Sequence, residues 1–335
     1  MIALAGCDPE PDEPGAIAER ALADNSVALN SARINGWTLN GWTLNGEALN
    51  GWTLNGWTLN GWTLNGVALV GSSFTGTQTI DGQTYTRAGQ DLIGSELQLV
   101  GPDAQQYTLR FDDIYVSPSD PTGDLYYYTV SVRDAATGTW SSLCHDGQGQ
   151  PTAAIALANT WNAVTGARVD APGTVTLACR GGVLAKCVEW GYRPWQTATQ
   201  CIGKTCTQVT LADHHQACTR MARADYCGDG TPHTFDNTPI DVYDRLKTPI
   251  QAEGTQKYAN WAVEAEWSPA GAVCVGDELR LKMFDDRGIP YEQPPCLAAI
   301  SGIDKCGDLK QHVESRVANK YCELWTDDPA ACAGN

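Results

Sequence analysis

Large apolar residues recur at every fifth position between Val27 and Phe74, most regularly within the sequence Asn-Gly-Trp-Thr-Leu. A period of five fits neither the 3.6-residue period of an α-helix nor the two-residue period of a β-strand. Such a fixed period is typical of a solenoid in which each repeat forms one side of a coil. We therefore expect residues 27–75 to form a short β-solenoid with this apolar column inside. The column consists of Leu29, Ile34, Leu39, Leu44, Leu49, Leu54, Leu59, Leu64, Leu69 and Phe74.

A second column lies two residues before the first and contains Trp, Val, Ala, Ser and Glu. The repeat resembles the pentapeptide-repeat family, which winds a four-sided right-handed β-helix and has small inward residues at this second position. Burying Glu47 without a partner would cost several kcal/mol, so we expect the second column to face outward; a wider coil is the alternative. Outward tryptophans would form a ligand-binding surface for sugar rings or a protein, unless they pack on the neighbouring domain or on one another. These candidates are Trp37, Trp42, Trp52, Trp57 and Trp62.

Asn-Gly pairs punctuate the repeat, from Asn35-Gly36 to Asn65-Gly66. Because Asn-Gly favours tight turns with positive φ, we expect each pair to form a corner of the coil. Ten repeats would make about two and a half turns, which bury too little apolar surface to fold alone. We therefore expect the repeat to cap the sheet that follows it.

Apolar and polar residues alternate in several segments between Gly76 and Asp146, with turn formers such as Pro118–Gly123 between them. This pattern predicts an antiparallel β region over residues 76–146. The sequence shows neither a parallel βαβ rhythm nor a glycine-rich phosphate loop, which disfavours nucleotide binding. The predicted strands are Gln83–Arg87, Glu96–Val100, Tyr107–Phe111 and Leu125–Val132.

The stretch from Leu211 to Asp244 is the densest in residues suited to chemistry, and it contains three of the five histidines. Apolar residues at helical spacing predict a short amphipathic helix in its first half, and Gly228 and Gly230 predict a turn after it. A second helix is predicted over Gly307 to Leu324 for the same reason. Together with the strands, these elements predict a mainly β fold with a few helices.

Twelve cysteines follow residue 143. An even number in an exported protein indicates disulfide bonding, here six bonds whose pairing stays open. A structural zinc site would need paired C-x2-C clusters, and the sequence has none, so we expect no metal and no cofactor. The cysteines are Cys144, Cys179, Cys187, Cys201, Cys206, Cys218, Cys227, Cys274, Cys296, Cys306, Cys322 and Cys332.

The run Ala224-Asp225-Tyr226-Cys227, continued by Gly-Asp-Gly, resembles the tetrapeptide for which the ADYC domain family is named. The resemblance extends upstream to Trp190–Trp195 and downstream to Gly271–Cys274, and it covers roughly residues 75 to 335. It implies a secreted or surface protein of the kind found in myxobacteria and their relatives. Because the family has no established activity, the resemblance implies no catalytic residue.

Leu4-Ala5-Gly6-Cys7 resembles the lipobox of bacterial lipoprotein precursors, in which the cysteine receives the lipid. A signal peptide has a basic region and about 7–15 apolar residues, so we expect it to begin upstream of Met1. The alternative is a chance cysteine after small residues. Asp8–Gly15 is acidic and rich in proline, which predicts an extended tether in residues 1–26. No apolar run approaches the 18 residues of a membrane-spanning helix, so we expect attachment through lipid alone.

Acidic residues outnumber basic residues by 39 to 22, which gives a net charge of −17. This charge disfavours nucleic acid and anionic membrane surfaces as partners. An envelope glycan or protein is the candidate partner that remains. We therefore expect an exported lipoprotein on the cell surface or in the periplasm.

A different hypothesis places an active site in the Leu211–Asp244 stretch. Carboxylates and a histidine could surround a hard cation, or a histidine could act as a general base. Local structural roles for the same residues are the alternative, and the sequence has no Gly-x-Ser-x-Gly nucleophile. Catalytic residues would have to line one pocket. The candidates are Asp229, His233, Asp236 and Asp241 for a cation, and His214, His215, Asp229 and His233 for catalysis.

Four regions follow from these patterns: a tether (1–26), the repeat (27–75), the antiparallel β region (76–146) and a disulfide-rich ADYC domain (147–335). The function they favour is binding or structural support at the cell envelope. The alternative function is that of a hydrolase or metal-dependent enzyme.

Overall fold

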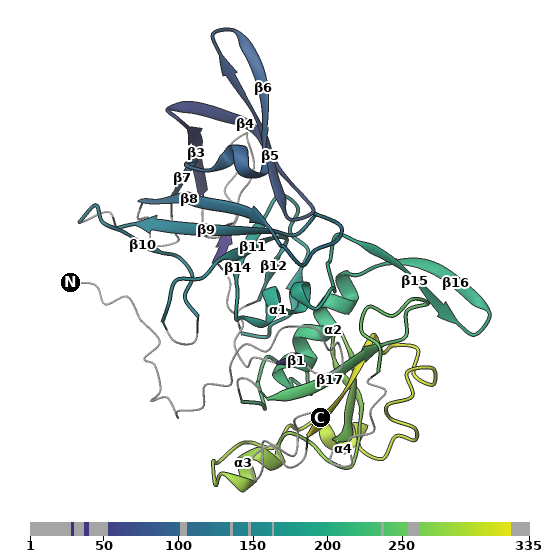
Figure 1. The fold of residues 1–335 in the computed structure, drawn as a ribbon. Coiled ribbons are helices and arrows are strands. Elements are labelled where there is room, and N and C mark those ends of the chain that lie inside the picture. Colours follow the sequence, from purple (N-terminus) through teal and green to yellow (C-terminus); the bar gives the residue numbers. More distant parts are fainter. Residues whose placement is uncertain are drawn as a thin grey trace.

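Two large β-sheets, two separate two-stranded hairpins and a few short helices make up the described part of the chain in a computed structural model (Figure 1). The structure describes residues 28–29, 37–39, 53–100, 106–134, 137–146, 149–162, 164–235, 238–253 and 261–322.

The larger sheet has 11 strands, in the order β2-β14-β11-β9-β8-β7-β3-β4-β5-β6 with β10 beside β9. Neighbouring strands are antiparallel throughout, and β6, β7, β8 and β9 confirm the four strands predicted from alternation. The strands are β2 Trp37–Leu39, β3 Thr53–Leu59, β4 Trp62–Val70, β5 Ser73–Ile80, β6 Gln83–Ala88, β7 Glu96–Val100, β8 Gln106–Val116, β9 Tyr126–Arg133, β10 Trp140–Ser142, β11 Ala154–Ala158 and β14 Val175–Cys179.

The described repeats form neighbouring strands of this sheet, so the expectation of a solenoid is wrong for residues 53–80. Asn60 and Gly61, at φ 52° and 79°, close a two-residue turn between β3 and β4. The Asn-Gly pair therefore adopts the positive φ angles that the sequence predicts. A two-residue turn of this kind reverses the chain into a hairpin, whereas a solenoid corner would only bend it.

The apolar column of the repeat faces the core, as expected, at Leu59, Leu64 and Phe74. Five is an odd number, so residues five apart on one regular strand would face opposite sides of the sheet. A β-bulge between Asn65 and Ala68 corrects this phase within β4. As a result Leu64 is buried in the same core against which Leu69 packs.

Two apolar cores cover the two faces of the larger sheet where β11 crosses it. Ala154 and Ala156 belong to the core that also contains Phe74, while Ile155 and Leu157 belong to the core with helix α1 (Val183–Glu189). This explains why β11 lacks polar residues, since alternate side chains enter different cores.

The smaller sheet has the strand order β1-β17-β20-β18-β19 and packs against helix α2 (Ala212–Arg223), which confirms the helix predicted there. Two hairpins stand apart, and β15–β16 projects from the body in Figure 1. The remaining elements are β1 Ala28–Leu29, β12 Thr160–Trp161, β13 Arg168–Val169, β15 Thr197–Ile202, β16 Thr205–Thr210, β17 Pro239–Asp244, β18 Trp261–Ser268, β19 Gly271–Val275, β20 Val317–Cys322, α3 Lys282–Asp286, α4 Leu297–Ile300 and a 3-10 helix, Gly89–Leu92.

The helix predicted over Gly307–Leu324 is wrong, because Val317–Cys322 forms strand β20 between β17 and β18. Val317 and Tyr321 are four residues apart, a spacing that suits one face of a helix and also one face of a strand. Because β20 pairs with β17 on one edge and with β18 on the other, this segment is a strand and not a helix.

All eleven described cysteines are disulfide-bonded, which confirms the expected oxidation for this part of the chain. Cys7 and Cys332 lie outside the described residues. Five pairs are Cys144–Cys179, Cys187–Cys218, Cys201–Cys206, Cys227–Cys296 and Cys274–Cys306.

Candidate functional site

Helix α2 carries the first half of the Leu211–Asp244 stretch through the interior of the protein, and Asp213 is its one residue that is not buried. The smaller sheet packs against the helix, and the disulfide Cys187–Cys218 joins it to α1. A helix covered on both sides must find buried partners for its polar side chains. The polar residues of this stretch therefore need hydrogen-bond partners because they are buried, whether or not they take part in catalysis.

Ala224 and Asp225 end this helix and fix the turn that follows. Ala224 adopts the left-handed conformation with φ 51°, and its N–H bonds back to the last turn of α2. Asp225 is fully buried; its carboxylate lies 2.6 Å from the Arg220 guanidinium and accepts the Gly230 N–H at 3.1 Å. The first two motif residues thus close the loop up to Gly230.

Tyr226 connects the motif to a buried ion pair. Its hydroxyl donates to Glu264 Oε1 at 2.6 Å, and Arg280 Nε donates to both oxygens of Glu264 at 2.8 Å. Asn319 Nδ2 donates to the other oxygen of Glu264 at 2.5 Å. Burial, followed by the charge of Glu264, raises the pKa of Tyr226 well above its usual value. The phenol therefore stays protonated and remains a donor.

Arg280 holds the end of α2 against the smaller sheet. Its guanidinium is fully buried and donates to the Met221 carbonyl at 2.5 Å and to Thr234 Oγ1 at 3.2 Å. A cation at the carbonyl end of a helix is favoured by the helix dipole. The fourth motif residue, Cys227, is bonded to Cys296 directly before α4. The whole tetrapeptide is thus built into buried contacts.

The second motif, Trp190–Trp195, contacts the loop between strands β8 and β9 of the larger sheet. Arg193 donates to Asp120 at 2.7 Å and also to Asp124, and the indole of Trp195 donates to Asp124 at 2.8 Å. Burial alone would raise the pKa of Asp120, but hydrogen bonds from Thr122 and Arg193 outweigh it and lower that pKa. The carboxylate is therefore a stable acceptor between β8 and β9.

Each of the three histidines in the central stretch packs on a different aromatic ring. His214 stacks on Tyr192, His215 lies edge-on to Trp161, and His233 contacts Tyr226. All three are at most 4% exposed. Burial lowers the pKa of His214 and of His215 to about 4. At neutral pH these two imidazoles are uncharged and shielded from solvent.

No described contact joins the four catalytic candidates. Asp229 is exposed and accepts the N–H of Thr231 at 2.9 Å, whereas His214 and His215 are buried. Of the cation candidates, Asp241 is 2% exposed on β17, and Asp236 lies outside the described residues. The described contacts of these residues are those of local structure, and the hypothesis that all four catalytic candidates line one pocket stays a prediction.

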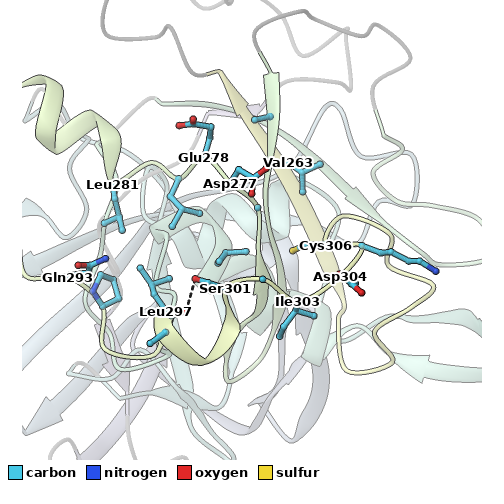
Figure 2. A pocket seen from close by; sticks show the side chains of 18 of the residues that line it. Val263, Asp277, Glu278, Leu281, Gln293, Leu297, Ser301, Ile303, Asp304 and Cys306 are labelled. Atoms are coloured by element: carbon cyan, nitrogen blue, oxygen red, sulfur yellow. Dashed lines mark hydrogen bonds between the residues drawn. The ribbon is translucent and has the colours of Figure 1, made fainter.

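A cavity of about 1260 Å³ lies between the β18–β19 edge, residues 277–281 and α4 (Figure 2). Apolar side chains of Val263, Leu281, Leu297 and Ile303 line it, and none of the four catalytic candidates does. Its charged lining residues are Asp277, Glu278 and Asp304 together with Lys305, so acidic groups outnumber the basic one.

Sequence reasoning missed this cavity and the Glu264–Arg280 pair. The lining residues are spread over residues 262–306 without a motif. Glu264 lies on a strand that reads Trp-Ala-Val-Glu-Ala-Glu-Trp-Ser, where a glutamate is expected to face solvent. Its burial depends on Arg280, 16 residues further on, which pairs with its charge, and on hydrogen bonds from Tyr226 and Asn319.

The remaining site predictions concern the N-terminal part. Trp62 is 44% exposed, as expected for its column, whereas Val67 of the same column is buried. Cys7, Trp42 and Trp52 lie outside the described residues, and the side chains of Trp37 and Trp57 do as well. Among the described residues, no helix is both long and apolar enough to cross a membrane.

A family model described as the ADYC domain matches residues 89–281, which is more than half of the 335-residue chain. The match includes Ala224–Cys227, Trp190–Trp195 and Gly271–Cys274, and it begins after the repeat. No curated protein and no solved structure matches the chain.

Proposed function

This chain belongs to the ADYC domain family, and from that membership we propose an extracytoplasmic, lipid-anchored protein with a binding or structural role at the cell envelope. One observation carries the proposal: every described cysteine is in a disulfide bond. Disulfides persist in oxidising compartments outside the cytosol and are rare inside it. An envelope location agrees with this chemistry.

The anchor in this proposal is Cys7, within Leu4-Ala5-Gly6-Cys7. A lipidated cysteine with two or three acyl chains attaches stably to a membrane, which a single chain does not achieve. The acidic, proline-rich run that follows would hold the folded part away from the bilayer surface.

The binding site in this proposal is the cavity of Figure 2, and the ADYC motif is its support. Tyr226 bonds to Glu264, which holds Arg280 between the lining residues Leu279 and Leu281. Cys227 bonds to Cys296, next to the lining residue Leu297. The apolar lining, and the excess of acidic over basic lining residues, suit an envelope component that carries an apolar group beside a positive charge.

The test uses fractionation followed by binding. Exported with a complete signal peptide, the wild-type protein should sediment with membranes, and Cys7→Ser should release it. The soluble Cys7→Ser protein should then bind isolated envelope fractions. Adding Asp277→Lys and Asp304→Lys should weaken that binding at least tenfold, because both changes repel a cationic ligand.

The matched control adds Asp91→Lys and Asp113→Lys, which make the same charge change at exposed positions that do not line the cavity. Equal binding by the cavity variant and the control would contradict the cavity as the binding site. Membrane sedimentation of Cys7→Ser at the wild-type level would contradict the lipid anchor.

A further inference from the structure

Four side chains of the kinds that bind zinc meet beside the cavity, at the edge of β18 and β19. Glu266 Oε1 lies 3.1 Å from His312 Nδ1, and Cys274 Sγ lies 4.0 Å from the same nitrogen. The donor atoms of Glu266, Cys274 and His312 are all within 4.8 Å of one another. Cys306 is the fourth member, because it is bonded to Cys274.

These distances are close to those of a tetrahedral zinc site. With Zn–S about 2.3 Å and Zn–N or Zn–O about 2.0–2.2 Å, the ligand atoms lie about 3.3–3.8 Å apart. The carboxylate–imidazole and thiolate–imidazole distances need to change by only a few tenths of an ångström. The two sulfur atoms also have to separate, which the disulfide bond now prevents.

Glu266 provides a second observation that points to a ligand. Its side chain is fully buried, and Oε2 has no hydrogen-bond partner among the described residues. Its Oε1 accepts hydrogen bonds from His312 Nδ1 and from the Gly307 N–H at 2.8 Å. Buried carboxylate oxygens are normally satisfied, so this one retains an unused capacity to bind a cation.

His312 is held in place by contacts other than the disulfide. Arg245, at the end of β17, donates to the carbonyl of His312 at 3.1 Å and to those of Leu309 and Val313 at 2.6 Å. Opening the Cys274–Cys306 bond would therefore leave the imidazole next to Glu266. The guanidinium also offsets the net negative charge that two thiolates and a carboxylate would leave around Zn²⁺.

We propose that the Cys274–Cys306 disulfide exchanges with a zinc site. A dithiol reductant gives two electrons and two protons to the disulfide, which becomes two thiols while the reductant becomes a disulfide. Zn²⁺ then binds the two thiolates, His312 Nδ1 and the Glu266 carboxylate, and the two thiol protons go to solvent. In either redox state, β19 stays connected to the loop after α4 that lines the cavity.

Both reagents can reach this position. Cys306 lines the cavity, as Figure 2 shows, and the His312 side chain is 16% exposed. Two other described disulfides reach solvent: Cys201–Cys206, in the projecting hairpin, and Cys227–Cys296, whose two cysteines are half-buried. The hairpin bond is removed before zinc binding to the reduced protein is measured, and alkylation of Cys227 and Cys296 is followed alongside that of Cys274 and Cys306.

The experiment uses the Cys201→Ser/Cys206→Ser protein, reduced under native conditions with a phosphine. Zn²⁺ is titrated against a chromophoric chelator, and Co²⁺ absorption reports sulfur ligation. We expect one tightly bound Zn²⁺ per chain and protection of Cys274 and Cys306 from alkylation, read by mass spectrometry. His312→Gln, which keeps every cysteine, should weaken zinc binding by more than about tenfold and remove the protection.

Three results would overturn the proposal: zinc binding by the His312→Gln protein as tight as by its parent, zinc protection of cysteines other than Cys274 and Cys306, or equal zinc binding by the oxidised protein. Circular dichroism of each reduced protein separates loss of the site from loss of the fold. If reduction unfolds the parent and zinc does not restore its spectrum, the exchange is also refuted.

Discussion

Tyr226 and Arg280 both donate to the buried carboxylate of Glu264. The stability of the fold depends on keeping every partner of this carboxylate. Removing one partner of a buried ion pair leaves an uncompensated charge and costs about 3–5 kcal/mol. The pair itself contributes far less, because both groups lose their hydration. The ion pair positions β18, which carries Glu264, relative to the cavity-lining segment around Arg280. The hydroxyl of Tyr226 donates to the same carboxylate.

His214 and His215 make the stability of the fold sensitive to acid. Burial lowers their pKa to about 4, whereas an unfolded histidine titrates near 6.5. The unfolded chain therefore binds more protons between these values, and stability that is fully present above about pH 6.5 is lost as the pH falls toward 4. The full loss is about 3–4 kcal/mol for each histidine.

His214→Leu isolates one of the two contributions. The ring nitrogens of His214 have no hydrogen-bond partner among the described residues, so the change removes a titrating group without breaking such a bond. Between pH 7 and 4.5, the variant should lose about 2–3 kcal/mol less unfolding free energy than the wild type, measured by urea denaturation. Asp244, whose pKa burial raises, acts in the opposite direction in both proteins. Equal slopes would refute the assignment.

At the scale of single residues, the sequence revealed which positions matter but not their partners. The tetrapeptide Ala224–Cys227 is recognisable as a motif, and the disulfide bonding expected for Cys227 is confirmed. The acceptor of the Tyr226 hydroxyl is 38 residues away, on β18. No spacing rule links such positions, because β-strand pairing and not local geometry brings them together.

At the scale of elements, the bulge in β4 reconciles a five-residue repeat with a two-residue strand period. Leu64 is 2% exposed and Trp62 is 44% exposed, so the two columns of the repeat differ in environment on the same strand. A buried carboxylate costs several kcal/mol when it has no partner. A half-exposed tryptophan contributes mainly surface packing.

Leu64→Asp should therefore unfold the β3–β5 region, while Trp62→Ser should change the unfolding free energy by about 1 kcal/mol or less. Thermal unfolding followed by circular dichroism measures both variants. Similar losses in the two proteins would show that Trp62 is part of the core. Trp62 would then no longer be a candidate for the ligand-binding surface.

Element type was predictable where one period dominated, as in the alternating segments that became β6 to β9 and in α2. It was not predictable where two architectures share a pattern. The repeat suits a coil or a bulged meander, and the choice depends on strand β7, which pairs with β3. The spacing of Val317 and Tyr321 suits a helix or a central strand, and the choice depends on β17 and β18.

At the scale of the molecule, the disulfides connect layers that the hydrogen bonds of the sheets do not join. Cys187–Cys218 joins α1 to α2, and Cys227–Cys296 joins the motif to α4 across a sequence separation of 69 residues. Cys201–Cys206, in contrast, closes a hairpin with a separation of 5 residues. The entropy that a crosslink removes from the unfolded chain grows with the length of the loop it closes.

Loss of the long crosslink should therefore destabilise the protein more than loss of the short one. The chain-entropy relation gives about 4 kcal/mol for Cys227→Ser/Cys296→Ser and about 2 kcal/mol for Cys201→Ser/Cys206→Ser. The first variant should also lower affinity for envelope fractions, because Cys296 precedes the cavity residue Leu297. The second should bind normally, because its hairpin lies outside the cavity lining. Urea denaturation under non-reducing conditions tests the first point, and the envelope-binding measurement tests the second. Equal effects of the two variants would mean that the motif disulfide supports the fold and the cavity no more than the disulfide of a surface hairpin does.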